Sequence, residues 1–351
     1  MANIPIIDIS AANKDAARQL LDAATDNGFV FVKPNHATGI STSEIEEMFD
    51  LSKAFFASPK EVKAQCTINS AESGKNRGWL GLHTETLDPA KQKVHQRGDF
   101  KEAFNFNPLE PAQPLSGPLA PARPRMLSFL EQCHALCLRI LQLFGEALET
   151  DPPSWFVERH DTASGDTDSV LRFLYYPGLT INDDYKDDVD VRAGAHSDYG
   201  SITLLFQQRG QPGLEIWSKN GQWESVPVDP SDDTPADEAL PLLVNIGDVL
   251  SYWTNGLLKS TVHRVIFPKG DAAASEFKQK DRYSMAYFCH ALVNAELVPV
   301  PSQLVERMSG TSEAKREMEK VKSLSGSGKV VTASDHLKAR LAATYDLAIK
   351  A

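Results

Sequence analysis

The chain has few cysteines, and they are far apart. Four occur among 351 residues, at positions 66, 133, 137 and 289. Cys133 and Cys137 are about one helical turn apart, a spacing that also suits a metal pair. We interpret them as small buried residues of an amphipathic helix, which is the commoner setting for free cysteine.

Long hydrophobic runs and an excess of basic residues are also missing. No apolar stretch approaches the roughly 20 residues that span a bilayer. The first ten residues lack the charged and apolar regions of a signal peptide, and the final Ile-Lys-Ala is not a peroxisomal signal. With 36 basic against 47 acidic residues, the net charge of −11 disfavours nucleic acid or an anionic membrane as partner. The sequence therefore predicts a cytoplasmic protein that acts on a small molecule.

The order of hydrophobic patterns predicts helices at both ends and a β-rich middle. Residues 14–27, 42–56, 125–148, 302–322 and 334–349 have helical periodicity, and 107–124 is rich in proline and predicted to be irregular. Short β-type runs recur between turn residues, as expected for a sandwich or barrel of antiparallel strands. The runs are 4–9, 28–33, 169–176, 201–207, 213–217, 242–250, 261–267 and 282–290.

Three potential metal ligands fall on these β-type runs. His196 and Asp198 are two residues apart, so on an extended segment their side chains share a face. His263 supplies a third ligand from another run. Two histidines and one carboxylate form the facial triad suited to non-haem Fe(II), although a zinc hydrolase could use the same ligands.

A candidate carboxylate site follows nineteen residues later. Arg282 and Ser284 share a strand face and offer a guanidinium fork beside a hydroxyl, a pairing suited to a carboxylate. Upstream, Arg172, Leu174 and Tyr176 also share one face of a strand. A cosubstrate with a chelating end and a distant carboxylate would fit between these groups, and 2-oxoglutarate has that shape.

In order, His196-Ser-Asp198, Asn255-Gly, Lys259-Ser-Thr-Val-His263-Arg-Val and Arg282-Tyr-Ser284 resemble the 2-oxoglutarate/Fe(II)-dependent dioxygenases of the isopenicillin N synthase-like superfamily. Upstream segments such as Asp99-Phe-Lys-Glu-Ala-Phe104 resemble its N-terminal region. Within the superfamily, the sequence around Arg192 to Phe206 and Leu341 to Tyr345 is most similar to the fungal thymine 7-hydroxylase group. The resemblance spans nearly the whole chain.

The resemblance implies an α+β fold with a mainly β core. That core would be a distorted double-stranded β-helix, or jelly roll, flanked by N-terminal and C-terminal helices. We accordingly expect an N-terminal dioxygenase region at 1–124, a long core-packing helix and connector at 125–168, the jelly-roll core at 169–300, and C-terminal helices at 301–351. Relatives of this kind are commonly monomers, so a monomer is expected.

The resemblance also assigns roles to residues. It makes His196, Asp198 and His263 the iron ligands, and it places the far carboxylate of 2-oxoglutarate on Arg282 and Ser284, with Tyr176 beside them. Plant relatives commonly have asparagine where this chain has Leu174. The positions that face the substrate in the thymine hydroxylase group are Arg172, Tyr199 and Phe288, with His290 standing where that group has asparagine. Arg172 has an alternative role, as one member of an ion pair that anchors its strand.

These residues predict an enzyme that uses Fe(II), 2-oxoglutarate and O2 to oxidise a C–H bond of a small organic molecule, with release of succinate and CO2. Hydroxylation is the simplest outcome, and the substrate would be a heteroaromatic catabolite or a secondary metabolite. Two alternatives stay open. One is an oxidase of the isopenicillin N synthase type, in which the Arg–Ser pair holds a substrate carboxylate. The other is a non-catalytic small-molecule receptor on the same scaffold.

Overall fold

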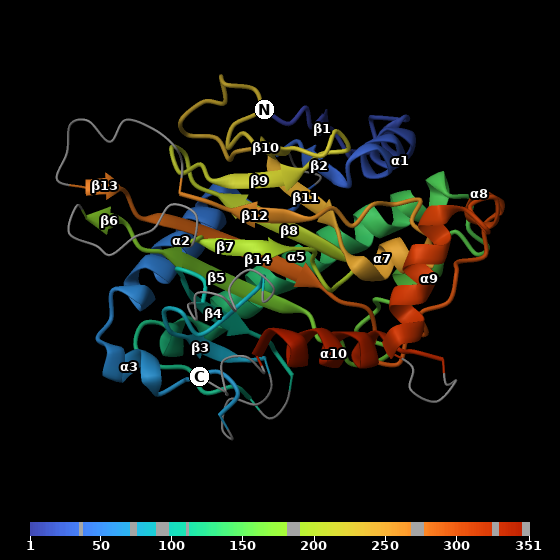
Figure 1. Ribbon diagram of the computed structural model, residues 1–351. Helices are drawn as coiled ribbons and strands as arrows, with labels where there is room; N and C mark the ends of the chain where they lie inside the picture. The colour runs from blue at the N-terminus through green and yellow to red at the C-terminus, as the bar shows by residue number, and fades with distance from the viewer. Residues whose placement is uncertain are drawn as a thin grey trace.

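The computed structural model shows two facing β-sheets with helices packed outside them (Figure 1). It describes residues 1–34, 38–70, 76–88, 98–109, 112–180, 190–267, 277–324 and 330–345. Within those ranges, no helix is both long and apolar enough to cross a membrane.

An eight-stranded sheet forms the larger layer. Its order is β1 (Ile6–Ile7), β2 (Phe29–Val32), β11 (Leu242–Ile246), β8 (Ile202–Gln207), β14 (Arg282–Cys289), β5 (Val170–Tyr176), β4 (Glu102–Phe106) and β3 (Gly78–Leu80). All its neighbouring strands pair antiparallel except β1 and β2. Strands from the first 106 residues therefore extend the same sheet that β5, β8, β11 and β14 build.

A four-stranded sheet covers part of the larger one. It runs β10 (Trp223–Ser225), β9 (Leu214–Trp217), β12 (His263–Val265) and β7 (Ala193–His196), and β13 (Phe277–Gln279) pairs separately with β6 (Leu179–Thr180). Apolar side chains of both main sheets, including Phe31, Leu214 and Val265, form one core between them. The strands thus make two layers around a shared interior.

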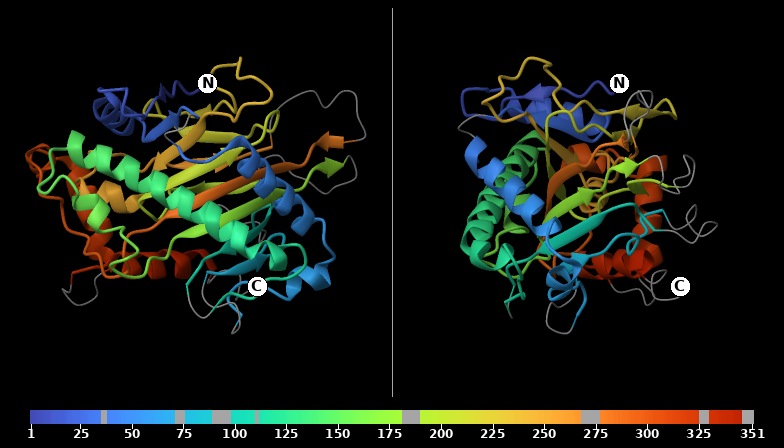
Figure 2. Two further views of the ribbon diagram at one scale, coloured as in Figure 1. Left: turned by 180° about the vertical axis from the view of Figure 1, so that it is seen from behind. Right: turned by 90° about the vertical axis from the view of Figure 1, so that its left-hand side faces the viewer.

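Helices cover the face of the large sheet that is turned away from the small sheet, and they also lie below the sheet in the view of Figure 1. In the left view of Figure 2, α5 (Leu119–Ala147) crosses in front of the strands, with α2 (Thr42–Phe56) alongside it, while α1 (Ala16–Asp26) lies near the N-terminus. The shorter helices are α3 (Lys60–Ala64), α6 (Trp155–Glu158), α7 (Asp248–Trp253) and α8 (Gln303–Glu306). The C-terminal pair, α9 (Ser312–Leu324) and α10 (Ala333–Tyr345), lies on the opposite side of the sheet from α5 (Figure 2).

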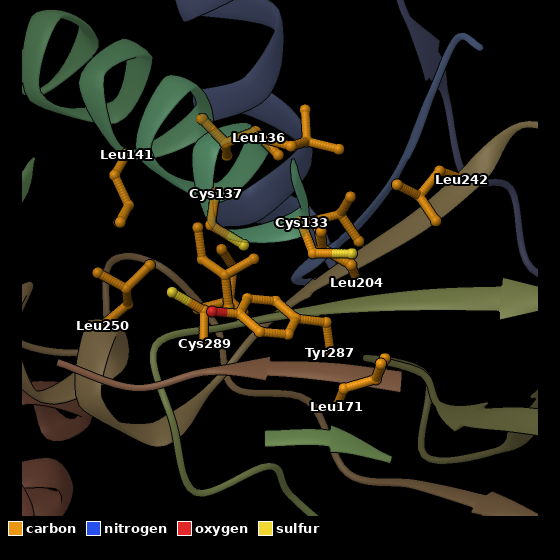
Figure 3. Packing of buried hydrophobic residues seen from close by; sticks show 14 of the residues in the cluster. Cys133, Leu136, Cys137, Leu141, Leu171, Leu204, Leu242, Leu250, Tyr287 and Cys289 are labelled. Atoms are coloured by element: carbon orange, nitrogen blue, oxygen red, sulfur yellow. The ribbon is translucent and has the colours of Figure 1, made fainter. Parts of the chain in front are cut away.

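Side chains along β14 point alternately to the helix-covered outer face of the large sheet and to the interior between the two sheets. Met285, Tyr287 and Cys289 pack outward against the helices, whereas the even-numbered residues face inward. Figure 3 shows Cys133 and Cys137 of α5 packed over Tyr287 and Cys289. All four cysteines are buried and outside any disulfide, and the burial of Cys133 and Cys137 in α5 confirms the packing interpretation of that pair.

Two local predictions were wrong. Helix α5 begins at Leu119, inside the stretch predicted to be irregular. The helix tolerates Pro121 because this proline lies in the first turn, where a backbone N–H would have no intrahelical acceptor. The strand predicted over 242–250 ends at Ile246, and α7 starts two residues later. The helical patterns predicted near 302–322 are confirmed as two helices, α8 and α9, which are separated by a turn in which Gly310 has a φ of +86°.

Candidate metal and cosubstrate site

Three side chains on or just beyond strands of the small sheet converge at one point in the cavity between the sheets. His196 ends β7, His263 begins β12, and the two are directly paired across the antiparallel ladder. Asp198 lies just beyond β7, with its Oδ1 3.8 Å from Nε2 of His196 and 3.6 Å from Nε2 of His263. Within the described part of the chain, no other group of three His, Cys, Asp or Glu residues brings its ligand atoms within 4.8 Å of one another. Two imidazole nitrogens and a carboxylate at this spacing fit a divalent metal ion.

Hydrogen bonds orient both imidazoles for metal binding. Nδ1 of His196 donates to the carbonyl oxygen of Gly194 at 2.7 Å, and Nδ1 of His263 donates to that of Thr261 at 3.1 Å. Since a carbonyl can only accept, the proton is on Nδ1 and Nε2 presents its lone pair. Burial, reinforced by the neighbouring His263, lowers the pKa of His196 to about 3. This imidazole is therefore neutral at pH 7, as a ligand must be.

Two buried donors hold the carboxylate of Asp198. The Thr203 hydroxyl (β8) donates to Oδ2 at 2.6 Å, and the Asn245 side-chain amide (β11) donates to the same oxygen at 2.7 Å. Burial opposes the charge, but the two imidazoles and these hydrogen bonds keep the pKa of Asp198 below its ordinary value. Oδ2 is thus occupied, and Oδ1 faces the histidines. Thr203 and Asn245 were not predicted, although inward-facing polar residues on buried strands are a signal for such a role.

The predicted carboxylate clamp lies in the same cavity, on the large sheet. Arg282 and Ser284 share the inner face of β14, and Nη1 of Arg282 donates to Oγ of Ser284 at 3.2 Å. Tyr176 pairs with Arg282 across the β5–β14 ladder, and the guanidinium lies 5.0 Å from its ring centroid. Burial lowers the pKa of Arg282 from its ordinary value. Leu174, the neighbour of Ser284 across the ladder, lines the cavity with an apolar side chain.

The four predicted substrate residues also line this cavity, but two of them have protein partners as well. Nη2 of Arg172 donates to Oε2 of Glu85 at 2.7 Å, so the ion pair considered as an alternative for Arg172 is present. The hydroxyl of Thr344 donates its hydrogen to the backbone carbonyl of Arg340 in α10. The Tyr199 hydroxyl is therefore the donor in its 2.7 Å hydrogen bond to Oγ1 of Thr344. Phe288 is partly buried and His290 is buried.

Sequence reasoning missed a buried charge network in the same wall. Nζ of Lys101 lies 2.8 Å from Oε2 of Glu85 and also contacts Oδ2 of Asp99. Burial favours the neutral forms, yet the ion pairs hold the pKa of Glu85 below and that of Lys101 above their ordinary values. Glu85 and Lys101 are therefore charged at neutral pH. Glu85 lies outside any strand and carries no sequence signal, since its cations are at positions 101 and 172.

Helix α10 forms one side of the cavity. Leu337, Leu341 and Thr344 line it, and the guanidinium of Arg340 lies 4.5 Å from the ring centroid of Tyr199. Helix α10 therefore closes one side of a site whose other walls come from the two sheets and from the segment around Glu85.

Comparison with known proteins agrees with this geometry. Residues 4–124 match the N-terminal region of the non-haem dioxygenases described from morphine synthesis, and residues 167–291 match the 2OG-Fe(II) oxygenase superfamily. A UPF0676 protein of Schizosaccharomyces pombe is 36% identical over 81% of this chain and 81% of its own length. The 2-oxoglutarate-Fe(II) type oxidoreductase ppzD of Metarhizium rileyi is 32% identical over 77% of this chain and 74% of its own. This chain belongs to the 2OG-Fe(II) oxygenase superfamily.

Solved structures of the superfamily superpose on nearly the whole molecule. The full-length thymine 7-hydroxylase of Neurospora crassa in complex with alpha-KG has a TM-score of 0.72 at 28% identity, covering 97% of this chain and 96% of that one. A 2OG-Fe(II) oxygenase family protein of Caulobacter crescentus has a TM-score of 0.69 at 26% identity, covering 97% of this chain and 99% of that one. The fold is that of a 2OG-Fe(II) oxygenase, built mainly of β-sheets with helices around them. The chain is accordingly an enzyme, a dioxygenase dependent on Fe(II) and 2-oxoglutarate.

Proposed function

We propose that this dioxygenase hydroxylates a C–H bond of a small organic molecule and releases succinate and CO2. A heteroaromatic catabolite or secondary metabolite is the substrate class that the aromatic and polar cavity residues favour. The observation that carries the proposal is that His196, Asp198 and His263 face the same cavity as Arg282 and Ser284. A metal and the far carboxylate of a diacid could then be held together.

In the proposed arrangement His196, Asp198 and His263 would hold Fe(II). The metal would supply the oxidising chemistry, with 2-oxoglutarate and O2 as co-reactants. Arg282 and Ser284 bind the far carboxylate, with Tyr176 supporting the guanidinium. The apolar lining, including Leu205, limits water at the reacting centre.

The fold supports a finer description as well. We propose that the two facing sheets are a distorted double-stranded β-helix, because the metal ligands and the clamp project from opposite sheets into one interior. The regions 1–124, 125–168, 169–300 and 301–351 remain our proposed division of the chain, and we propose that it works as a monomer in the cytoplasm.

Substrate-coupled succinate release under O2 tests the proposal. Turnover of the substrate should produce one succinate for each product molecule. Turnover without succinate would identify an oxidase of the isopenicillin N synthase type. Anaerobic titration with Fe(II) and 2-oxoglutarate should give a weak visible charge-transfer band. Its absence in well-folded protein would favour a receptor without catalysis.

A further inference from the structure

We propose that Gln207 and Gln211 are positioning residues for the cosubstrate: they orient the guanidinium of Arg282 through uncharged acceptors and so leave its positive charge to the far carboxylate of 2-oxoglutarate. This inference rests on the proposed function, which puts that carboxylate on Arg282 and Ser284. Neither glutamine lines the cavity, so each would act through Arg282 and not by touching the cosubstrate.

Arg282 is a buried cation without a carboxylate partner among the residues that the structure describes. The residue is only 1% exposed. Burial lowers the pKa of Arg282, and the described group that counters this effect is Tyr176 rather than an Asp or Glu. A buried charge without a counter-ion is costly, so the carboxylate of a bound molecule is the natural partner of this guanidinium.

Uncharged oxygens fix the direction of the Arg282 guanidinium. Its Nε donates to the backbone carbonyl of Gln211 at 3.1 Å, its Nη1 to Oγ of Ser284 at 3.2 Å, and its Nη2 to Oε1 of Gln207 at 3.5 Å. Because none of these acceptors is a carboxylate, they orient the planar fork without cancelling its charge. A carboxylate in place of the Gln207 amide would instead compete with the cosubstrate for the same cation.

The side chain of Gln211 anchors the loop whose carbonyl holds the guanidinium. Strand β8 ends at Gln207, so the backbone N–H of Tyr283 lies past the end of the ladder between β8 and β14. Oε1 of Gln211 accepts this N–H, after a turn in which Gly210 has a φ of +70°. The amide of Gln211 thus takes the place of a strand residue and ties the loop to the strand that carries Arg282.

Anaerobic titration of the full chain loaded with Fe(II) tests this role, with 2-oxoglutarate and 2-oxopentanoate as probes. The two molecules share the keto acid end and the chain length, but 2-oxopentanoate ends in a methyl group. The ratio of their dissociation constants, read from the charge-transfer band, therefore measures the contribution of the far carboxylate. The unmodified chain should prefer 2-oxoglutarate by about a hundredfold. A missing band, or equal affinities in the unmodified chain, overturns the proposed site itself.

The role of Gln207 is tested by adding a charge. Gln207→Glu gives the guanidinium a carboxylate within the chain, so the preference for 2-oxoglutarate should fall by at least about tenfold. Gln208→Glu is the matched control, because Gln208 is also partly buried in this loop, but its Oε1 accepts from Nε2 of Gln211 and not from Arg282. It adds the same charge and should change the preference by less than about threefold. Equal falls in both variants, or none in Gln207→Glu, overturn the role of Gln207.

The role of Gln211 is tested by removing its amide. Gln211→Leu frees the loop from Tyr283, so the preference for 2-oxoglutarate should fall by about tenfold. In an Arg282→Lys background the same change should have no further effect, since no fork is left to orient.

The matched control for this variant is Gln113→Leu. Oε1 of Gln113 likewise accepts a backbone N–H, that of Asn107 at 3.1 Å, and Gln113 does not line the cavity. This control should lose stability in denaturant titrations and keep the preference. An unchanged preference in Gln211→Leu, with a normal preference in the unmodified chain, overturns only this inference. A further fall when Gln211→Leu is combined with Arg282→Lys would show that the loop does not act through the guanidinium.

Discussion

His196 and His263 face each other as a directly paired couple on antiparallel strands, with ring centroids 4.4 Å apart. Each ring is fixed by an Nδ1 hydrogen bond to a backbone carbonyl two residues earlier. Residues 67 positions apart in the sequence thus form one candidate metal-binding face on paired strands. We expect placement on paired strands to keep the geometry of the site when no metal is bound.

Replacing Asp198 tests the metal site directly. Asp198→Ala removes the one carboxylate of the proposed metal triad and leaves Thr203 and Asn245 as buried donors without that acceptor. We expect loss of Fe(II) on desalting, with the fold retained at a stability cost of about 1–3 kcal/mol. Iron content and circular dichroism measure the two effects. Asp229→Ala, which removes a carboxylate paired with Arg209 at the surface, should keep its iron. Iron retention by Asp198→Ala would place the site elsewhere.

The donors behind Asp198 give a second prediction. Thr203→Val preserves shape but removes the hydroxyl bound to Oδ2, so the carboxylate is less well oriented toward the histidines. Fe(II) affinity should fall by about 10–100-fold, as is typical when the partner of a metal ligand is lost. The control is Thr254→Val, since Thr254 is also buried and donates to Leu250 away from the cavity. Equal affinities in the two variants would show that Thr203 does not position the ligand.

A third prediction concerns the clamp for the cosubstrate. Arg282→Lys keeps the charge but replaces a planar fork with a point charge, so the concentration of 2-oxoglutarate needed for half-saturation should rise by about tenfold or more. The charge-transfer band under anaerobic conditions reports this directly. Arg264→Lys changes an arginine on the small sheet that pairs with Glu215, and it should leave the requirement unchanged. If Arg282→Lys also leaves it unchanged, the far carboxylate binds elsewhere.

The side chains that could be predicted from sequence are those placed by short-range periodicity. Alternation puts Arg282 and Ser284 on one face of a strand, and the spacing of His196 and Asp198 keeps them together at the end of β7. The association of Lys101 with Glu85 depends on how β4 and a preceding loop meet, and no local pattern encodes it. The contribution of α10 was missed for the same reason, because tertiary packing decides which surface a terminal helix covers.

Packing of α10 creates a buried histidine that the proposed chemistry does not use. His336 lies between the hydroxyl of Tyr252, 3.2 Å from its Nε2, and Asp248, whose Oδ2 is 3.7 Å away. Burial, together with the positive charges of Arg340 and Lys320, lowers the pKa of His336 to about 3. Burial also raises the pKa of Asp248. The imidazole is therefore neutral in the folded protein over most of the range in which an unfolded histidine becomes charged.

Because the pKa of His336 differs between the folded and unfolded states, the stability of the metal-free protein depends on pH. The unfolded chain binds a proton at position 336 below a pH of about 6.5, whereas the folded chain does so only near 3, so stability falls as pH decreases between these values. At pH 5 this group should cost about 2 kcal/mol relative to pH 7. His336→Gln cannot take up the proton, so its free energy of unfolding should decrease less between pH 7 and 5. Denaturant titrations at pH 7 and pH 5 measure this change in the free energy of unfolding for the unmodified chain and for the variant. Both proteins retain His196 and His290, so the contributions of these two residues cancel when the changes are compared. Parallel curves would mean that His336 is already protonated in the folded state.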